Sequence, residues 1–113
     1  MNKRSLGTEK EILAAEYLQE QGYQILEQNF RCRMGEIDMI ASHDGAIIFI
    51  EVKYRSSREY GMAVEAVSQT KQRTIRKVAM YYLVTKLHRS DVECRFDVIG
   101  IDGEQITHIV NAF

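Results

Sequence analysis

The sequence lacks the features that would direct a 113-residue chain into a membrane or an oxidising compartment. No apolar run approaches the roughly 20 residues of a membrane-spanning helix, and the N-terminal segment MNKRSLGTEKEI lacks the apolar core of a signal peptide. The two cysteines, Cys32 and Cys94, lie far apart and form no CxxC pair, which favours reduced structural thiols. We therefore expect a cytoplasmic protein that does not enter a membrane.

The sequence also contains no low-complexity tract. With 45% hydrophobic and 27% charged residues, its composition is ordinary for a globular protein. A chain of this length buries one core but not two, so we expect a single domain over residues 1–113.

The chain has little net charge, but its charges are unevenly distributed. The net charge of −1 by itself does not indicate a nucleic-acid partner. Residues 1–51 carry five Lys and Arg against nine Asp and Glu, whereas residues 53–77 carry seven Lys and Arg against two Glu. An acidic pocket beside a basic segment suits a metal site next to a phosphate backbone. The solvated face of a helix would also account for the basic segment, so charge alone leaves both interpretations open.

Residues 34–53, MGEIDMIASHDGAIIFIEVK, are expected to form two strands joined by a tight turn. Asp44-Gly45 between two apolar runs is a strong short-range signal for a hairpin. With these residues in the turn, antiparallel pairing sets Asp38 directly opposite Glu51, so both side chains should share one face of the sheet.

A pair of opposed carboxylates is unfavourable in a purely structural hairpin. The carboxylates of Asp38 and Glu51 would repel each other, and burial of an unpaired charge is costly. Their apolar neighbours Ile40, Phe49 and Ile50 indicate partial burial. A divalent cation between the carboxylates would remove the conflict, because hard cations such as Mg²⁺ bind carboxylate oxygens. Metal ligands are therefore favoured over surface salt-bridge partners.

Lys53 should share a face with Glu51, because the two are two residues apart in one strand, while Val52 points to the other face. Beside a bound cation, Lys53 could orient or deprotonate a water molecule, or offset charge that develops on a phosphate. It could also pair with Glu36, which the register places opposite it. For Glu36, a salt bridge, an outer hydrogen-bond acceptor and a water-mediated ligand all remain open.

The flanking elements follow from capping signals and periodicity. Thr8-x-x-Glu11 matches a capping box, in which Glu11 returns a hydrogen bond to the start of a helix. A break is expected around Ser68, before apolar residues at helical spacing. We predict a helix from Thr8 to Gln21, a strand from Tyr23 to Phe30, a helix from Val64 to Leu87, and strands from Cys94 to Ile101 and Gln105 to Val110 around a turn at Asp102-Gly103.

Basic residues after the hairpin are candidates for contact with nucleic acid. The loop Tyr54–Gly61 carries Arg55 and Arg58 interleaved with tyrosines, which suits a sugar-phosphate strand, although an ordinary connector explains it equally well. Near the start of the second helix, Lys71 and Gln72 could reach the rim of the site and a phosphate. The nucleic-acid-binding candidates are thus Arg55, Arg58, Lys71, Gln72 and Arg73.

Other charged residues are expected to form ordinary ion pairs. Arg31 and Arg33 lie in the link to the hairpin, where charge pairing is favoured over contact with phosphate. Asp97 should pair with a neighbouring Arg in a structural rather than catalytic role.

Asp38 followed by Glu51-Val52-Lys53 resembles the PD-(D/E)xK motif of metal-dependent nucleases, with Ile37 in place of the Pro. A longer pattern is more specific. The strings NFRCRMGEID (29–38), FIEVKYR (49–55) and KQR (71–73) together resemble the YraN-like family of bacterial proteins. That family is assigned to the restriction-endonuclease-like superfamily, and the similarity runs from about Gly7 to Asp97. Lys10 stands where YraN-like proteins usually have Gly.

The resemblance implies an α/β fold with a restriction-endonuclease-like core, a mixed β-sheet flanked by helices in the order αβββαβ, with or without one extra strand. It implies that Asp38 and Glu51 hold Mg²⁺ or Mn²⁺ with the backbone carbonyl of Val52, and that Lys53 assists the attacking water. Related resolvase-like nucleases carry a Glu in the first helix ahead of a Gly-aromatic pair, so Glu11 would complete the catalytic acidic cluster.

The leading hypothesis is therefore a Mg²⁺- or Mn²⁺-dependent nuclease that hydrolyses DNA phosphodiester bonds, with branched or repair and recombination intermediates among its candidate substrates. The alternative is a catalytically silent module that keeps the nuclease fold and binds nucleic acid or a protein. So short a chain offers little surface for substrate choice, which a homodimer or another partner would supply.

Overall fold

The computed structural model describes residues 3–55, 67–89 and 91–113. Along the chain the elements alternate in the predicted order, a helix, three strands, a helical segment and two strands, so the extra strand is present. They are α1 (Lys3–Glu20), β1 (Gln24–Cys32), β2 (Gly35–His43), β3 (Ala46–Arg55), α2 (Gln69–Tyr82), the π-helical segment η2 (Leu83–Leu87), β4 (Cys94–Asp102) and β5 (Gln105–Ile109).

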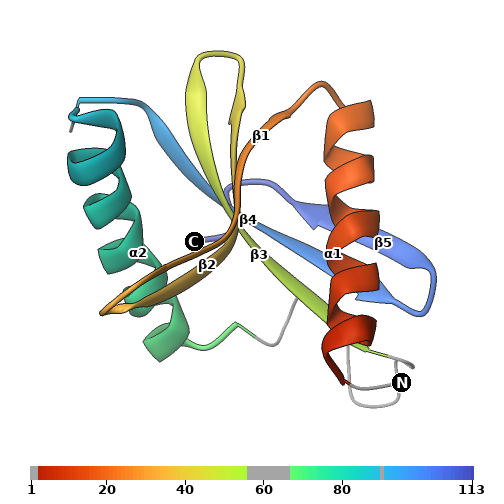
Figure 1. Ribbon diagram of the computed structural model, residues 1–113. Helices are drawn as coiled ribbons and strands as arrows, with labels where there is room; N and C mark the ends of the chain where they lie inside the picture. Colours follow the sequence, from red (N-terminus) through yellow and green to blue (C-terminus); the bar gives the residue numbers. More distant parts are fainter. Residues whose placement is uncertain (1–2, 56–66, 90) are drawn as a thin grey trace.

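The strands of the described ranges form one mixed, five-stranded sheet in the order β1-β2-β3-β4-β5. The pair β3 and β4 is parallel, and the other neighbours are antiparallel. A parallel pair needs a crossover connection, which α2 supplies between β3 and β4. Figure 1 shows α1 and α2 on opposite sides of the sheet. The prediction of a mixed sheet flanked by helices is therefore confirmed.

Alternation along the strands divides the apolar side chains between two cores. On one face, Ala14 and Leu18 of α1 pack with Ile48 and Ile50 of β3 and Ile99 of β4. On the other face, Phe49 packs against the predicted apolar stripe of the second helix. That stripe consists of Ile75, Val78, Ala79, Tyr82 and Leu83. The side chains of β3 thus pack in both cores, and β3 is the middle strand of the sheet.

Helix α1 begins at Lys3 and not near Thr8, so the predicted start is wrong. A capping box is a local preference, and here the helix continues through it because residues 3–7 contain no proline to stop it. The C-terminal end is as predicted. The backbone N–H of Tyr23 donates to the carbonyl of Leu18 (2.9 Å), a bond that closes a helix at its last turn.

The β2–β3 hairpin has the predicted turn, and both Asp44 (φ +49°) and Gly45 (φ +82°) have the positive φ that such two-residue turns require. Opposed residues pair in the predicted register from His43 and Ala46 back to Met39 and Ile50. The ladder ends there. Figure 1 shows the two strands diverging beyond this point.

The predicted pairs Asp38–Glu51 and Glu36–Lys53 are therefore not part of the ladder, and that part of the register is wrong. Each strand stays with its outer neighbour instead. Glu36 pairs with Arg31 of β1, whereas β3 continues along β4 with Glu51 opposite Val98. The backbone N–H of Val52 donates to the Asp38 side chain, which replaces a ladder bond with a side-chain bond.

The last two strands match the prediction to within one residue at each end, whereas the second helix starts later than predicted. Helix α2 starts after Ser68, whose hydroxyl accepts a hydrogen bond from the Lys71 N–H (3.1 Å), so the predicted break is confirmed, while residues 64–66 lie outside the described ranges. Asp102 pairs with Gln105, which places the last turn one residue later than predicted. No helix in the described ranges is long and apolar enough to cross a bilayer.

Candidate metal centre

Asp38 and Glu51 meet where β2 and β3 part. The Asp38 Oδ2 atom accepts a hydrogen bond from the backbone N–H of Val52 at 2.8 Å, which turns the carboxyl group towards β3. The side chains of Asp38 and Glu51 share a hydrogen bond, and the Glu51 side chain is only 3% exposed. The contact between two acidic groups survives the loss of strand pairing because the Val52 N–H holds one of them.

Burial raises the pKa of Asp38 to about 8, and the hydrogen bond and negative charge of Glu51 add to the effect. The Val52 N–H and the Lys71 ammonium oppose it, since both favour the ionised carboxylate. Near neutral pH Asp38 is therefore expected to keep its proton when no cation is bound. Two carboxyl groups in contact at a buried point are a donor set suited to a divalent cation.

Two lysines lie against the same oxygen of Glu51. The Lys53 Nζ atom is 3.5 Å and the Lys71 Nζ atom 3.4 Å from Glu51 Oε2. Lys53 comes from β3, two residues beyond Glu51 on the same face, while Val52 enters the core under α1 as predicted. Lys71 comes from the first turn of α2, which brings a second cation to the site.

The oxygen donors present fit Mg²⁺ or Mn²⁺, because these cations accept one or two protein carboxylates and complete their coordination with water. The carbonyl of Val52 remains a predicted ligand. Within the described ranges, no three or more His, Cys, Asp or Glu side chains form a group that could hold a metal. Among residues 3–55, 67–89 and 91–113, the structure thus brings Asp38 and Glu51 together without a third carboxylate.

Glu11 lies elsewhere in the hydrogen-bond network. Its Oε2 atom accepts a hydrogen bond from Asn29 Nδ2 at 2.7 Å, near the end of β1, where Asn29 has a φ of +54°. This bond links α1 to β1 through two partly or fully exposed side chains. The structure places Glu11 in contact with Asn29, and its catalytic role remains a prediction.

Glu36 forms an ion pair with Arg31, with 2.8 Å between Glu36 Oε2 and Arg31 Nε. The prediction that Arg31 takes part in charge pairing is confirmed, and of the alternatives for Glu36 the salt bridge is observed, with Arg31 in place of Lys53. Both residues line a surface hollow of about 500 Å³ with Cys32 and Gly35. A side chain at Gly35 would meet Thr74 Cγ2 at 2.6 Å, so α2 packs directly on the start of β2.

The predicted nucleic-acid-binding residues occupy different environments. Arg55 is the last residue of β3, and Arg58 lies outside the described ranges. Gln72 Nε2 donates to the Val67 carbonyl (3.3 Å), and Arg73 Nη2 to Thr70 Oγ1 (3.4 Å), so both contact the start of α2. Of these residues with described side chains, Lys71 is the one in contact with Glu51.

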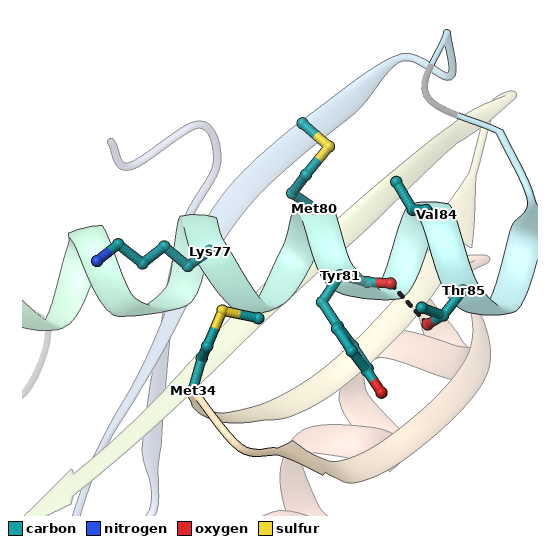
Figure 2. A pocket seen from close by; sticks show the side chains of 6 residues that line it. All are labelled: Met34, Lys77, Met80, Tyr81, Val84 and Thr85. Atoms are coloured by element: carbon teal, nitrogen blue, oxygen red, sulfur yellow. Dashed lines mark hydrogen bonds between the residues drawn. The ribbon is translucent and has the colours of Figure 1, made fainter.

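An apolar groove of about 350 Å³ lies on the solvent side of α2 and η2 (Figure 2). It is bounded by the β1–β2 turn at Met34 and by helical residues, and Figure 2 shows the Lys77 side chain running along the helix at one end. Its described lining residues are Met34, Lys77, Met80, Tyr81, Val84 and Thr85, none of which belongs to the carboxylate pair.

A second buried carboxylate, Asp97, was expected to pair with a neighbouring Arg, and this is confirmed. Arg95 donates to both Asp97 oxygens at 2.9 Å, and the Asn111 N–H donates to one of them. His108 Nε2 lies 2.7 Å from Asp97 Oδ2, and Tyr17 OH lies 3.2 Å from His108 Nδ1. Sequence reasoning missed His108 and Tyr17 because residues so far apart in sequence carry no common spacing signal.

Residues 10–101 match the family described as "Uncharacterised protein family UPF0102". The UPF0102 protein of Lachnoclostridium phytofermentans is 50% identical over 113 residues, which cover all of this chain and 96% of the relative. A UPF0102 protein of Shewanella sp. strain W3-18-1 is 46% identical over 96% of this chain and 98% of its own length. That of Caldanaerobacter subterraneus subsp. tengcongensis is 41% identical over this whole chain and 98% of its own. The chain therefore belongs to the UPF0102 family, which is the YraN-like family of the sequence resemblance.

Proposed function

We propose that this protein is a Mg²⁺- or Mn²⁺-dependent nuclease that hydrolyses DNA phosphodiester bonds. The observation that carries the proposal is the buried contact between Asp38 and Glu51, with two lysine ammonium groups within 3.5 Å of Glu51. Carboxyl groups are costly to bury side by side unless a cation compensates their charge. A site with this composition suits catalysis on a phosphate diester, which itself carries negative charge.

The arrangement of elements supports a restriction-endonuclease-like core as the finer description of the fold. The three antiparallel strands, the crossover helix α2 and the parallel strand β4 follow the order expected from the PD-(D/E)xK resemblance. In this arrangement the motif residues Asp38 and Glu51 come directly after Met39–Ile50, the last pair of the β2–β3 ladder. The carboxylates are thus held by the sheet, which is a rigid support for a catalytic site.

Asp38 and Glu51 would hold the cation, together with the carbonyl of Val52. When bound, a divalent cation polarises the phosphate and lowers the pKa of a coordinated water. Lys53 keeps its ammonium group beside Glu51, from where it can orient the attacking water or balance charge on the phosphate. The Val52 N–H donates a 2.8 Å hydrogen bond to Asp38, which holds the carboxyl group of this proposed ligand in one orientation.

The substrate is proposed to be DNA because residues 53–77, which follow Asp38 and Glu51 in the sequence, carry an excess of positive charge. Arg55 and Arg58 lie two and five residues after Lys53 in the sequence, and Lys71 to Arg73 lie near the start of α2. Basic side chains from these two segments of the sequence would contact a sugar-phosphate backbone. A homodimer would double this surface and suit branched or recombination intermediates.

A silent nucleic-acid-binding module is the second candidate. It is favoured by the two lysines that already neutralise Glu51, and by the lack of a third acidic ligand within the described ranges. On this view the basic segment would bind DNA and the carboxyl pair would be structural. The two candidates differ in whether DNA is cleaved once a cation is supplied.

The test is cleavage of linear and branched DNA with Mg²⁺ or Mn²⁺ by wild type and Asp38→Asn. Asn preserves the size of the side chain and an oxygen for the Val52 N–H, but removes a ligand charge. We expect the variant to lose at least about 100-fold in rate, because catalysis depends on the bound cation. Glu16→Gln, at an exposed position of α1, is the matched control and should cleave like wild type. Equal cleavage by wild type and Asp38→Asn would refute the assignment, and DNA binding without cleavage would favour the silent module.

A further inference from the structure

One oxygen of Glu51 faces two ammonium groups that arrive from different elements. Lys53 is part of the same strand, and its Nζ atom is 3.5 Å from Glu51 Oε2. Lys71 comes from α2, at 3.4 Å from the same atom. The Glu51 side chain is buried, whereas the Lys71 side chain is 35% exposed. Lys71 therefore joins a buried carboxylate to solvent, and its long side chain can leave that carboxylate without unfolding the core.

The position of Lys71 in α2 is unfavourable without Glu51. It is the third residue after the N-cap Ser68, and the first turn of this helix contains no acidic residue. The N-terminal end of a helix carries partial positive charge, so a lysine there is destabilising unless an anion compensates it. Glu51 is that anion.

The backbone of α2 is held close to the sheet at this end. Thr74, three residues after Lys71, packs against Gly35 so closely that a Cβ atom on Gly35 would lie 2.6 Å from Thr74 Cγ2. Close packing leaves little freedom for the helix to move relative to β2. A change of partner by Lys71 is therefore a side-chain movement.

We propose that Lys71 is a positioning residue that takes the place of the divalent cation at Glu51. When the cation binds, Lys71 leaves this carboxylate. Its ammonium group then becomes available to a DNA phosphate. This inference rests on the proposed function, because it assumes a cation site at Asp38 and Glu51. It assigns Lys71 a role distinct from that of Lys53, which remains beside Glu51 as part of the same strand. The second ammonium group at Glu51 thus couples cation binding to substrate binding.

This exchange of Lys71 for the cation at Glu51 predicts two opposite effects of Lys71→Met. Without divalent cations the variant loses one of the two ammonium groups beside Glu51, so its melting temperature should fall below that of wild type. Its affinity for Mn²⁺ should rise about five- to tenfold, because the cation no longer competes with the lysine. Saturating Mn²⁺ should then abolish the difference in melting temperature, since Lys71 no longer stabilises Glu51 in either protein. If Lys71 were merely structural, the Lys71→Met variant would be less stable than wild type both with and without the cation.

The experiment is calorimetric titration of Mn²⁺ into wild type and variants, with thermal melts in chelator and in saturating Mn²⁺, and with binding of a short DNA duplex. Lys71→Arg keeps the charge and should retain near wild-type Mn²⁺ affinity. Lys77→Met removes the same charge from the same helix, at the groove of Figure 2, and should leave both Mn²⁺ affinity and the melting temperature within error of wild type. Lys71→Met should bind the duplex at least about threefold more weakly when Mn²⁺ is present.

The outcomes separate this inference from the proposed function. Wild type that binds Mn²⁺, together with a Lys71→Met variant of unchanged or weaker Mn²⁺ affinity, would overturn the exchange and leave the nuclease proposal intact. An equal gain of affinity in Lys77→Met would reduce the effect to general electrostatics and overturn it as well. Wild type that binds no Mn²⁺, either alone or with the duplex present, would overturn both proposals.

Discussion

Asp38 and Asp97 are both carboxylates within the sheet, but their surroundings are opposite. Asp97 is 0% exposed, and Arg95, His108 and the Asn111 N–H together contact both of its oxygens. Burial by itself would raise the pKa of Asp97, but the hydrogen bonds from His108, Arg95 and Asn111 hold it at about 2. Asp38 faces another carboxyl group, and its pKa is raised to about 8.

The difference separates structural from functional burial of charge. At Asp97 the protein supplies every compensating group, so the carboxylate ties β4 to β5 and to the chain after it. At Asp38 the protein supplies one backbone N–H and the nearby charge of Lys71, which do not outweigh burial beside a second acid. Perturbed acids whose compensation is incomplete cluster at functional sites, whereas fully compensated ones are found in ordinary cores. The contrast is the physical reason for locating the chemistry at Asp38 and not at Asp97.

The largest expected effect is on stability at the Asp97 network. Asp97→Asn should lower the free energy of unfolding by about 3 kcal/mol, because it leaves Arg95 partly buried without its counter-ion. Urea denaturation followed by circular dichroism measures this change. Asp38→Asn in chelator should cost no stability, since it removes an acid that must take up a proton to be buried beside Glu51. Equal destabilisation by the two variants would remove the distinction between the two carboxylates.

A smaller effect is expected in the dependence of stability on pH without divalent cations. The pKa of Asp38 is higher in the folded than in the unfolded protein, so its contribution to stability is lost as pH rises from about 4 towards 8. Between pH 5 and 8, wild type should lose at least about 1.4 kcal/mol relative to Asp38→Asn, the equivalent of one pKa unit. The pKa of Asp97 is lowered, so its stabilising contribution is lost instead as pH falls through about 4 to 2. Parallel curves for wild type and Asp38→Asn from pH 5 to 8 would contradict the assignment.

The smallest effect is expected at an exposed carboxylate. Glu36→Gln removes the ion pair with Arg31, whose side chain is 75% exposed, and should change the free energy of unfolding by less than about 1 kcal/mol. The change should shrink further in high salt, because surface pairs are screened. A loss as large as that of Asp97→Asn would mean that exposure does not explain the difference between these carboxylates.

The sequence by itself determined the order of the elements and most of the hairpin. Asp44-Gly45 between two apolar runs specified a two-residue turn, and the turn specified the pairing up to Met39 and Ile50. The alternation of Glu51, Val52 and Lys53 was equally local, because side chains in a strand alternate between faces. The start of α1 was not determined in this way, since its capping signal is only a weak local preference.

Only the tertiary structure decided which charges meet. At this point β2 stays paired with β1, and β3 stays paired with β4. Asp38 still contacts Glu51 because a backbone N–H of β3 binds the Asp38 side chain. The contact of Lys71 with Glu51 depends on how α2 crosses the sheet, and the contact of Asp97 with His108 depends on the pairing of β4 with β5. Periodicity along a chain carries no information about such distant pairs, which arise from the packing of whole elements.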